Sequence, residues 1–290
     1  MSMISQGAAE RDDAGTDAQV AVLLPRASAR EKTLRIVIPI LTVILVVVAW
    51  QAIVSINHIP KYILPSPVDV AVSFFTSDWP ILLPALWVTL QITFMALVLA
   101  LVGGVAIAVI LVQSRWIELA VYPIAVILQV TPIVAIAPLL LIYTPNTQTA
   151  LLICAFLVAF FPILSNMVQG LKSVDHNLLN LFDLYGASRW QQLIYLKLPA
   201  AQPYFMVGLK IGGGLSLIAA VVAEFSAGSS GAGSGLAFRL LEAGYRLNMP
   251  RLFGALLLLS LTGVAIFGAT SLVSWLALHR WHESAVRREN

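Results

Sequence analysis

The chain has 290 residues, of which 59% are hydrophobic and only 11% are charged, and its mean hydropathy is +0.90. Soluble domains carry about 25% charged residues, so this composition excludes an ordinary soluble domain and predicts an all-α integral membrane protein. The net charge of +3 does not indicate nucleic-acid binding, because the basic residues flank apolar runs instead of forming a stripe on a soluble domain. The single cysteine, Cys154, lies inside an apolar run, so no intrachain disulfide is expected.

Six apolar runs are each long enough to cross a bilayer, which takes roughly 20 mostly apolar residues. They cover approximately Ile36–Ile56, Trp87–Val112, Trp116–Ile142, Gln148–Gly170, Tyr204–Phe225 and Leu252–Leu278. We therefore predict six transmembrane helices within a domain of residues 34–280. Residues 1–33 are polar and lack helical periodicity, so we predict a disordered tail there, and residues 281–290 are predicted to be a short C-terminal tail.

The positions of lysine and arginine predict the orientation of the chain, because cytoplasmic loops are enriched in these residues. If both termini are cytoplasmic, 13 of the 17 basic residues lie on the cytoplasmic side and only four lie on the external side. These four are Lys61, Arg239, Arg246 and Arg251. The opposite orientation would invert this bias, so we expect a multi-pass protein with cytoplasmic termini.

Between the first two spans, the external segment from Ile59 to Phe75 contains three prolines, which block a continuous helix. The segment is predicted to lie along the membrane interface, and it could also contact an external partner.

The cytoplasmic segment at about 172–200, between the fourth and fifth spans, is predicted to form two short amphipathic helices that dock on a partner outside the lipid. Gly186 allows a break between these helices. Ser188 and Gln191 form an S-x-x-Q capping pair for the second helix, and Leu198–Pro199 is predicted to end it. The residues that we expect to contact the partner are Leu178, Leu181, Phe182, Asp183, Tyr185, Gly186, Ala187, Ser188, Trp190, Leu198 and Pro199.

Polar residues inside the spans are candidates for a translocation path, because such residues are costly in lipid. In the third span, Gln129 and Thr131 precede Pro132, where we predict a kink near the middle of the membrane. In the fifth span, Lys210 and Glu224 are the charged residues. Lys210 could instead snorkel to the inner surface, and Glu224 could instead cap the following turn or bind an external arginine.

The fifth span also carries Gly208 and Gly212 in G-x-x-x-G spacing. Such glycines let helix backbones approach closely in a membrane. Gly212 could therefore pack against a neighbouring helix, act as a hinge or line the path.

The chain contains no metal-binding, paired-cysteine or nucleophile-elbow pattern. The glycine-rich run Gly228–Gly235 lacks the lysine followed by serine or threonine that phosphate-binding loops carry, and it is predicted to be an external turn. We therefore expect no catalytic residues, no metal and no cofactor. The energy for any transport must come from a partner or from an ion gradient.

The cytoplasmic segment resembles the EAA loop in the permease subunits of binding-protein-dependent ABC importers, whose pattern is EAA, three residues, glycine, nine residues and Ile-x-Leu-Pro. Here nine residues separate Gly186 from Leu196-Lys197-Leu198-Pro199. The resemblance to the nitrate, sulfonate and taurine permease group runs from about Tyr62 to Phe267. Its other shared motifs are Leu64–Pro67, Phe160–Ile163 with Asn166 and Gly170, and Val221–Phe225.

Two segments depart from the pattern of this group. The EAA triplet falls on Asn180-Leu181-Phe182, so the acidic residue of the family is missing, and Asp183 could take over part of its polar contact. The segment Thr144–Thr147 lacks the glycine-containing turn common in relatives. These departures weaken the assignment of a solute more than that of a family.

The resemblance implies a type I ABC importer permease in the bacterial inner membrane. Its implied partners are a second copy of the chain in a homodimer, two cytoplasmic ATP-binding subunits, an external or periplasmic solute-binding protein and membrane lipid. The implied solute is a nitrate-, sulfonate- or taurine-like anion, or a small heterocycle. The alternative is an ion-coupled secondary transporter or channel, which would favour paired ionisable groups at mid-membrane; a membrane-embedded enzyme lacks a supporting residue set.

Overall fold

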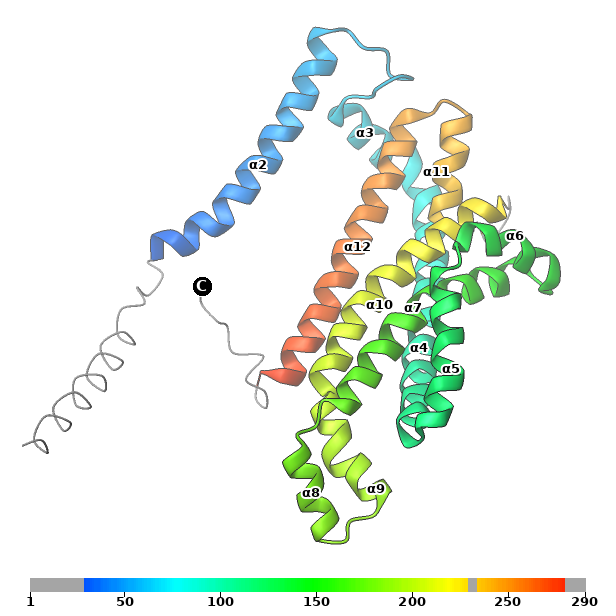
Figure 1. Ribbon diagram of the computed structural model, residues 1–290. Helices are drawn as coiled ribbons and strands as arrows, with labels where there is room; N and C mark the ends of the chain where they lie inside the picture. The colour runs from blue at the N-terminus through cyan, green and yellow to red at the C-terminus, as the bar shows by residue number, and fades with distance from the viewer. Residues whose placement is uncertain (1–28, 229–233, 280–290) are drawn as a thin grey trace, which may run out of the picture. The chain divides into compact units, whose positions relative to one another are not determined.

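A computed structural model describes residues 29–228 and 234–279, and within these ranges every regular element is a helix (Figure 1). The elements are α2 (Ala29–Ile56), α3 (Pro67–Ser73), the π-helical turn η1 (Phe74–Asp78), α4 (Trp79–Gln113), α5 (Arg115–Val130), α6 (Ile133–Tyr143), α7 (Thr147–Lys172), α8 (His176–Leu184), α9 (Arg189–Gln192), the π-helical turn η2 (Leu193–Lys197), α10 (Leu198–Ala227), α11 (Leu236–Tyr245) and α12 (Met249–Leu278). The helical fold predicted from composition is confirmed.

The chain divides into two compact units, and the boundary along the sequence falls between His58 and Ile59. In the first unit the described residues form α2, which begins at Ala29 and so includes the last residues of the segment predicted to be a disordered tail. Residues 1–28 of that tail and the predicted C-terminal tail at 281–290 lie outside the described residues. All the other helices belong to the second unit.

Within residues 29–228 and 234–279, five helices are long and apolar enough to cross a membrane: α2, α4, α7, α10 and α12. They include the predicted first, second, fourth, fifth and sixth spans. The predicted third span over Trp116–Ile142, with a kink at Pro132, is interrupted in the structure by a sharp bend. That segment forms α5 and α6, which meet at a bend of 99° and make either a broken span or a re-entrant loop. By length and composition, the described residues therefore provide five candidate spans, or six if the bent pair counts as one.

The bend has a local cause in the backbone of two residues. Thr131 has φ −70° and ψ 124°, and Pro132 has φ −62° and ψ 121°, so both are extended. A residue before proline is pushed out of the helical region, and proline has no N–H to continue the hydrogen-bond ladder. The predicted kink at Pro132 therefore lies where the structure bends, and the bend is 99°.

Helix α7 lies at the centre of the second unit, packed against α4 on one side and α10 on the other. Ile163 of α7 is fully buried, and a Cβ at Gly104 of α4 or at Gly212 of α10 would come within 3.0 Å of its side chain. A Cβ at Gly208 would lie 3.2 Å from the Ile163 Cα. The glycines therefore permit close contact between helices, as small residues do in membrane bundles.

The prediction that Leu198–Pro199 ends the second cytoplasmic helix is wrong. Leu198 is helical, with φ −64° and ψ −45°, and α9, η2 and α10 follow one another directly. Pro199 falls in the first turn of α10, immediately after η2, where the Leu198 N–H donates to the Leu193 carbonyl in a π-type turn. The wider π turn relieves the clash that a proline ring makes with the carbonyl four residues earlier in a regular helix.

Two ends of the second unit are distinguished by their short elements (Figure 1). At one end α8 and α9 form a projection between α7 and α10, which we call the α8–α9 hairpin. At the opposite end, α11 connects α10 to α12, and α3 packs against α12; we call this the α11 end.

Gly170 and Gly214 provide a matched test of the close packing between α7 and α10. A Cβ at Gly170 would lie 2.9 Å from the backbone Cα of Ala201, whereas a Cβ at Gly214 meets no described atom within 4 Å. Gly170→Ala should therefore destabilise the protein by about 1–3 kcal/mol through overpacking. Gly214→Ala should be neutral or stabilising, because alanine favours a helix more than glycine does. Thermal unfolding in lipid nanodiscs measures both, and equal melting temperatures would contradict the packing described.

Candidate functional site

The α8–α9 hairpin is built by local sequence chemistry. The Asp175 side chain caps α8 by accepting a hydrogen bond from the Asn177 N–H at 2.9 Å. At the other end Gly186 has φ +69°, the Gly186 N–H donates to the Asp183 carbonyl and the Ala187 N–H donates to the Phe182 carbonyl. This pair of bonds around a left-handed glycine is a Schellman motif, so the predicted break at Gly186 is confirmed.

The second helix of the hairpin starts as the sequence predicts. Ser188 and Gln191 form a reciprocal capping box, in which the Gln191 N–H donates to the Ser188 hydroxyl and the Ser188 N–H donates to the Gln191 side chain. The Gln192 side chain donates to the Asp183 carboxylate at 2.6 Å. Asp183 therefore joins α9 to α8.

A groove of about 440 Å³ runs along the hairpin. It is lined by Leu181, Phe182, Tyr185, Gly186, Ala187, Gln191 and Tyr195. Around it, Leu178 is 45% exposed, Tyr185 82% and Trp190 65%. Of the other residues predicted to contact a partner, Ser188 caps α9, and Leu198 and Pro199 begin α10. A cluster of exposed apolar and aromatic side chains on a projecting element is typical of an interaction site.

At the α11 end, a buried carboxylate joins three helices. Glu224 of α10 is 2% exposed; its Oε1 accepts from the Thr89 hydroxyl of α4 at 2.7 Å, and its Oε2 accepts from the Ala237 N–H at 2.9 Å. The Leu236 N–H donates to the Thr89 oxygen at 2.8 Å. We call this the Thr89–Glu224 network; it satisfies N–H groups in the first turn of α11, where a negative charge is favourable.

Gly235, at the N-cap of α11, is part of the same arrangement. A Cβ at this position would overlap the Glu224 carboxylate, so only glycine leaves room for the carboxylate at the start of the helix. From the sequence, Glu224 was considered as a possible cap for the turn that follows it. The observed hydrogen bond from the Ala237 N–H to Glu224 is a contact of this kind. Its hydrogen-bonding partner Thr89 was not among the predicted site residues.

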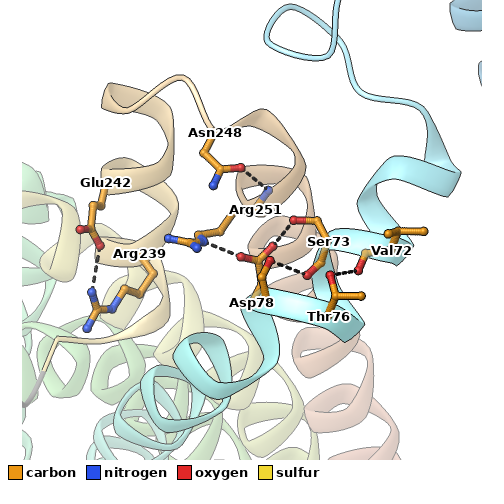
Figure 2. Close-up of polar contacts among 9 residues, drawn as sticks. Val72, Ser73, Thr76, Asp78, Arg239, Glu242, Asn248 and Arg251 are labelled. Carbon is orange, nitrogen blue, oxygen red and sulfur yellow. Dashed lines mark hydrogen bonds and ion pairs between the residues drawn. The ribbon is translucent and has the colours of Figure 1, made fainter.

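A buried ion pair lies nearby, at the junction of η1, α4 and α12 (Figure 2). Asp78 is fully buried, and its carboxylate accepts from Arg251 Nε at 2.6 Å and from the Ser73 hydroxyl at 2.6 Å. Sequence reasoning identified Arg251 only as an external basic residue and missed Asp78. The one signal was the Asp78-Trp79-Pro80 run, which is typical of a helix start.

The remaining candidates for a translocation path lie apart from the Thr89–Glu224 network. Gln129 and Thr131 end α5 at the bend, where the Thr131 hydroxyl donates to the Ile127 carbonyl at 2.7 Å. Lys210 lines a cavity of about 270 Å³ between α10 and α12. Gly212 is buried on a different face of α10, against Ile163 of α7. The structure thus does not gather these residues into one site.

The fold and these two ends define a class: a helical, multi-pass membrane protein with an exposed, grooved hairpin at one end and a polar junction at the other. Within the described residues, no group of three or more His, Cys, Asp or Glu side chains is placed to hold a metal ion.

Comparison with known proteins identifies the family. Residues 100–288 match the family described as "Binding-protein-dependent transport system inner membrane component", and the chain belongs to that family. It is 31% identical over 252 residues to a probable ABC transporter permease protein of Haemophilus influenzae, covering 86% of this chain and 98% of the relative.

Further relatives carry the names of different solutes. The chain is 33% identical to a riboflavin transport system permease protein of Chloroflexus aurantiacus, covering 84% of this chain and 89% of the relative. It is 28% identical to a formylaminopyrimidine transport permease protein of Halalkalibacterium halodurans, covering 80% and 90%. Other relatives are named as permeases for aliphatic sulfonates, taurine and nitrate. The predicted family is thus confirmed, and the names of the relatives do not converge on one solute.

The Thr89–Glu224 network can be tested against a neighbouring threonine. Thr89→Val should deprive Glu224 and the Leu236 N–H of a partner at a cost of about 1–3 kcal/mol, and so raise hydrogen exchange at the start of α11 about tenfold. Thr93, one turn further along α4, is also buried, and its hydroxyl has no partner among the described residues. Thr93→Val should therefore leave exchange in α11 unchanged. Mass spectrometry resolves both, and equal exchange in the two variants would contradict the role of Thr89.

Proposed function

We propose that this chain is the membrane-spanning permease subunit of an ABC importer, which moves a small solute across the inner membrane while partner subunits hydrolyse ATP. The observation that carries this proposal is the exposed, apolar groove on the α8–α9 hairpin. Family membership supports it, because the family is described as depending on a binding protein. In this proposal the chain itself catalyses no reaction, and the partner subunits hydrolyse the ATP.

In this proposal the α8–α9 hairpin faces the cytoplasm and docks on one ATP-binding subunit. The homodimer would present two hairpins to two such subunits, and the solute-binding protein would deliver solute at the α11 end. The lysine and arginine bias supports this orientation, because 13 of the 17 basic residues fall in segments that this topology assigns to the cytoplasmic side. ATP can drive transport only if the partner contacts the hairpin differently in the two states of the permease.

The solute is expected to be either a small heterocycle or a small anion. The named relatives include a riboflavin permease and a formylaminopyrimidine permease, and also permeases for aliphatic sulfonates, taurine and nitrate. In proteoliposomes that contain the permease, its ATP-binding subunit and its binding protein, uptake of one of these solutes should require ATP. Uptake by the permease alone under an ion gradient would favour a secondary transporter instead.

The hairpin groove generates a sharper test of docking. Leu181→Asp places a charge in the groove, and burying that charge against a partner is costly, so binding of the ATP-binding subunit should weaken by about tenfold or more. Asn180→Glu adds the same charge to the neighbouring exposed position of α8, outside the groove. This control should bind as well as the unmodified chain, or better, because it restores the acidic residue of the EAA pattern. Copurification of the two subunits and ATP-driven uptake measure the effect, and unchanged binding by Leu181→Asp would contradict docking at the groove.

A further inference from the structure

The α11 end contains a hollow of about 670 Å³ that none of the roles above uses. Its wall on α4 is largely apolar, with Pro84 and Trp87 among the lining residues, and Trp87 is 62% exposed. Its opposite wall, from α11 and the start of α12, carries Arg239, Arg246 and Arg251. The volume falls within the range of small-molecule sites, which combine apolar walls with a few polar groups.

The positive charge of this hollow is only partly neutralised. Arg239 Nη1 and Arg246 Nη2 each lie 2.9 Å from Glu242, so two guanidinium groups share one carboxylate. Arg251 is paired with the buried Asp78 (Figure 2). Among the described residues around the hollow, three arginines thus face two carboxylates, which leaves one positive charge.

Arg239 has hydrogen-bonding capacity that its surroundings do not use. Its side chain is only 28% exposed and its Nε is buried, yet this Nε has no hydrogen-bond partner among the described residues. A guanidinium carries five N–H donors in a planar fork that matches the oxygens of a carboxylate, sulfonate or phosphate. Because the Nε is buried, an oxyanion in the hollow would bind the terminal nitrogens of Arg239, and the excess positive charge nearby favours such an anion.

We propose that this hollow binds a small organic anion, with its charged group against Arg239 and Arg246 and its apolar body against Pro84 and Trp87. Arg251 contributes positive charge while it remains paired with Asp78. The same charged group could come from a soluble organic acid or from an anionic lipid headgroup. The separate apolar wall favours the soluble acid, because a lipid places its apolar chains in the membrane and not beside its headgroup. This extends the proposed transport function by giving one class of solute a binding site on the permease itself.

The test uses the full chain in nanodiscs of phosphatidylcholine, with 1-hexanesulfonate as probe and 1-hexanol as its neutral counterpart. Ligand-observed NMR titration measures binding without transport, so a failed uptake assay would not be confused with a failed site. We expect hexanesulfonate to bind and hexanol to bind at least about fivefold more weakly, because charge-assisted hydrogen bonds to arginine are lost. Equal binding of the two probes would overturn the proposal.

Variants then locate the site. Arg239→Gln and Arg246→Gln should each weaken hexanesulfonate binding about fivefold or more. Lys61→Gln removes the same charge from a lysine that pairs with Asp69 and does not line the hollow, and it should leave binding unchanged. An equal loss in all three variants would mean only non-specific attraction and would overturn the proposal.

Glu242→Gln gives a result that misfolding cannot imitate. It removes the carboxylate that Arg239 and Arg246 share, so the affinity for hexanesulfonate should rise about threefold or more. An unchanged affinity would show that these arginines do not hold the probe. Nanodiscs that also contain phosphatidylglycerol test whether an anionic lipid headgroup occupies the hollow instead. If this lipid displaces hexanesulfonate and the displacement depends on Arg239, the hollow binds a lipid headgroup, and the proposal for a soluble anion is overturned.

Discussion

The α11 end depends on one carboxylate that has been taken out of solvent. A polar side chain is costly to bury unless hydrogen bonds satisfy it, and Glu224 obtains them from the Thr89 hydroxyl and from the first turn of α11. Because these partners come from separate elements, the Thr89–Glu224 network fixes α4, α10 and α11 relative to one another. The arginines of α11 are therefore held over the end of α4, and the hollow between them exists because of this junction.

The rest of the bundle makes that junction possible by bringing backbones close together. Hydrophobic association alone is weak between helices in lipid, so packing must come from close contact. Gly104 and Gly212 provide it on either side of Ile163 in α7. Larger residues at these positions would push α4 and α10 away from α7, which would also separate Thr89 from Glu224. The glycines at the centre and the polar network at the end thus serve the same geometry.

The parts of this structure that were predictable from the sequence depend on neighbours along the chain. The break at Gly186 and the capping box of Ser188 and Gln191 involve residues within a few positions, and their residue types permit few alternatives. The contact between Thr89 and Glu224 joins residues 135 positions apart, and that between Asp78 and Arg251 joins residues 173 positions apart. A single sequence contains no signal for which distant carboxylate meets which donor.

Pro132 and Pro199 show that the same residue type can have different effects on a helix, so a proline alone does not predict where a helix ends. Both Pro132 and Pro199 remove a backbone donor, yet the chain bends by 99° at the first and stays helical through the second. The difference lies in the preceding turn, because η2 widens the backbone before Pro199, whereas Thr131 leaves the helical region before Pro132. As a result, α9, η2 and α10 form one backbone connection from the α8–α9 hairpin to Glu224. A partner that displaces the hairpin would therefore act on the same helix that holds α11 in place.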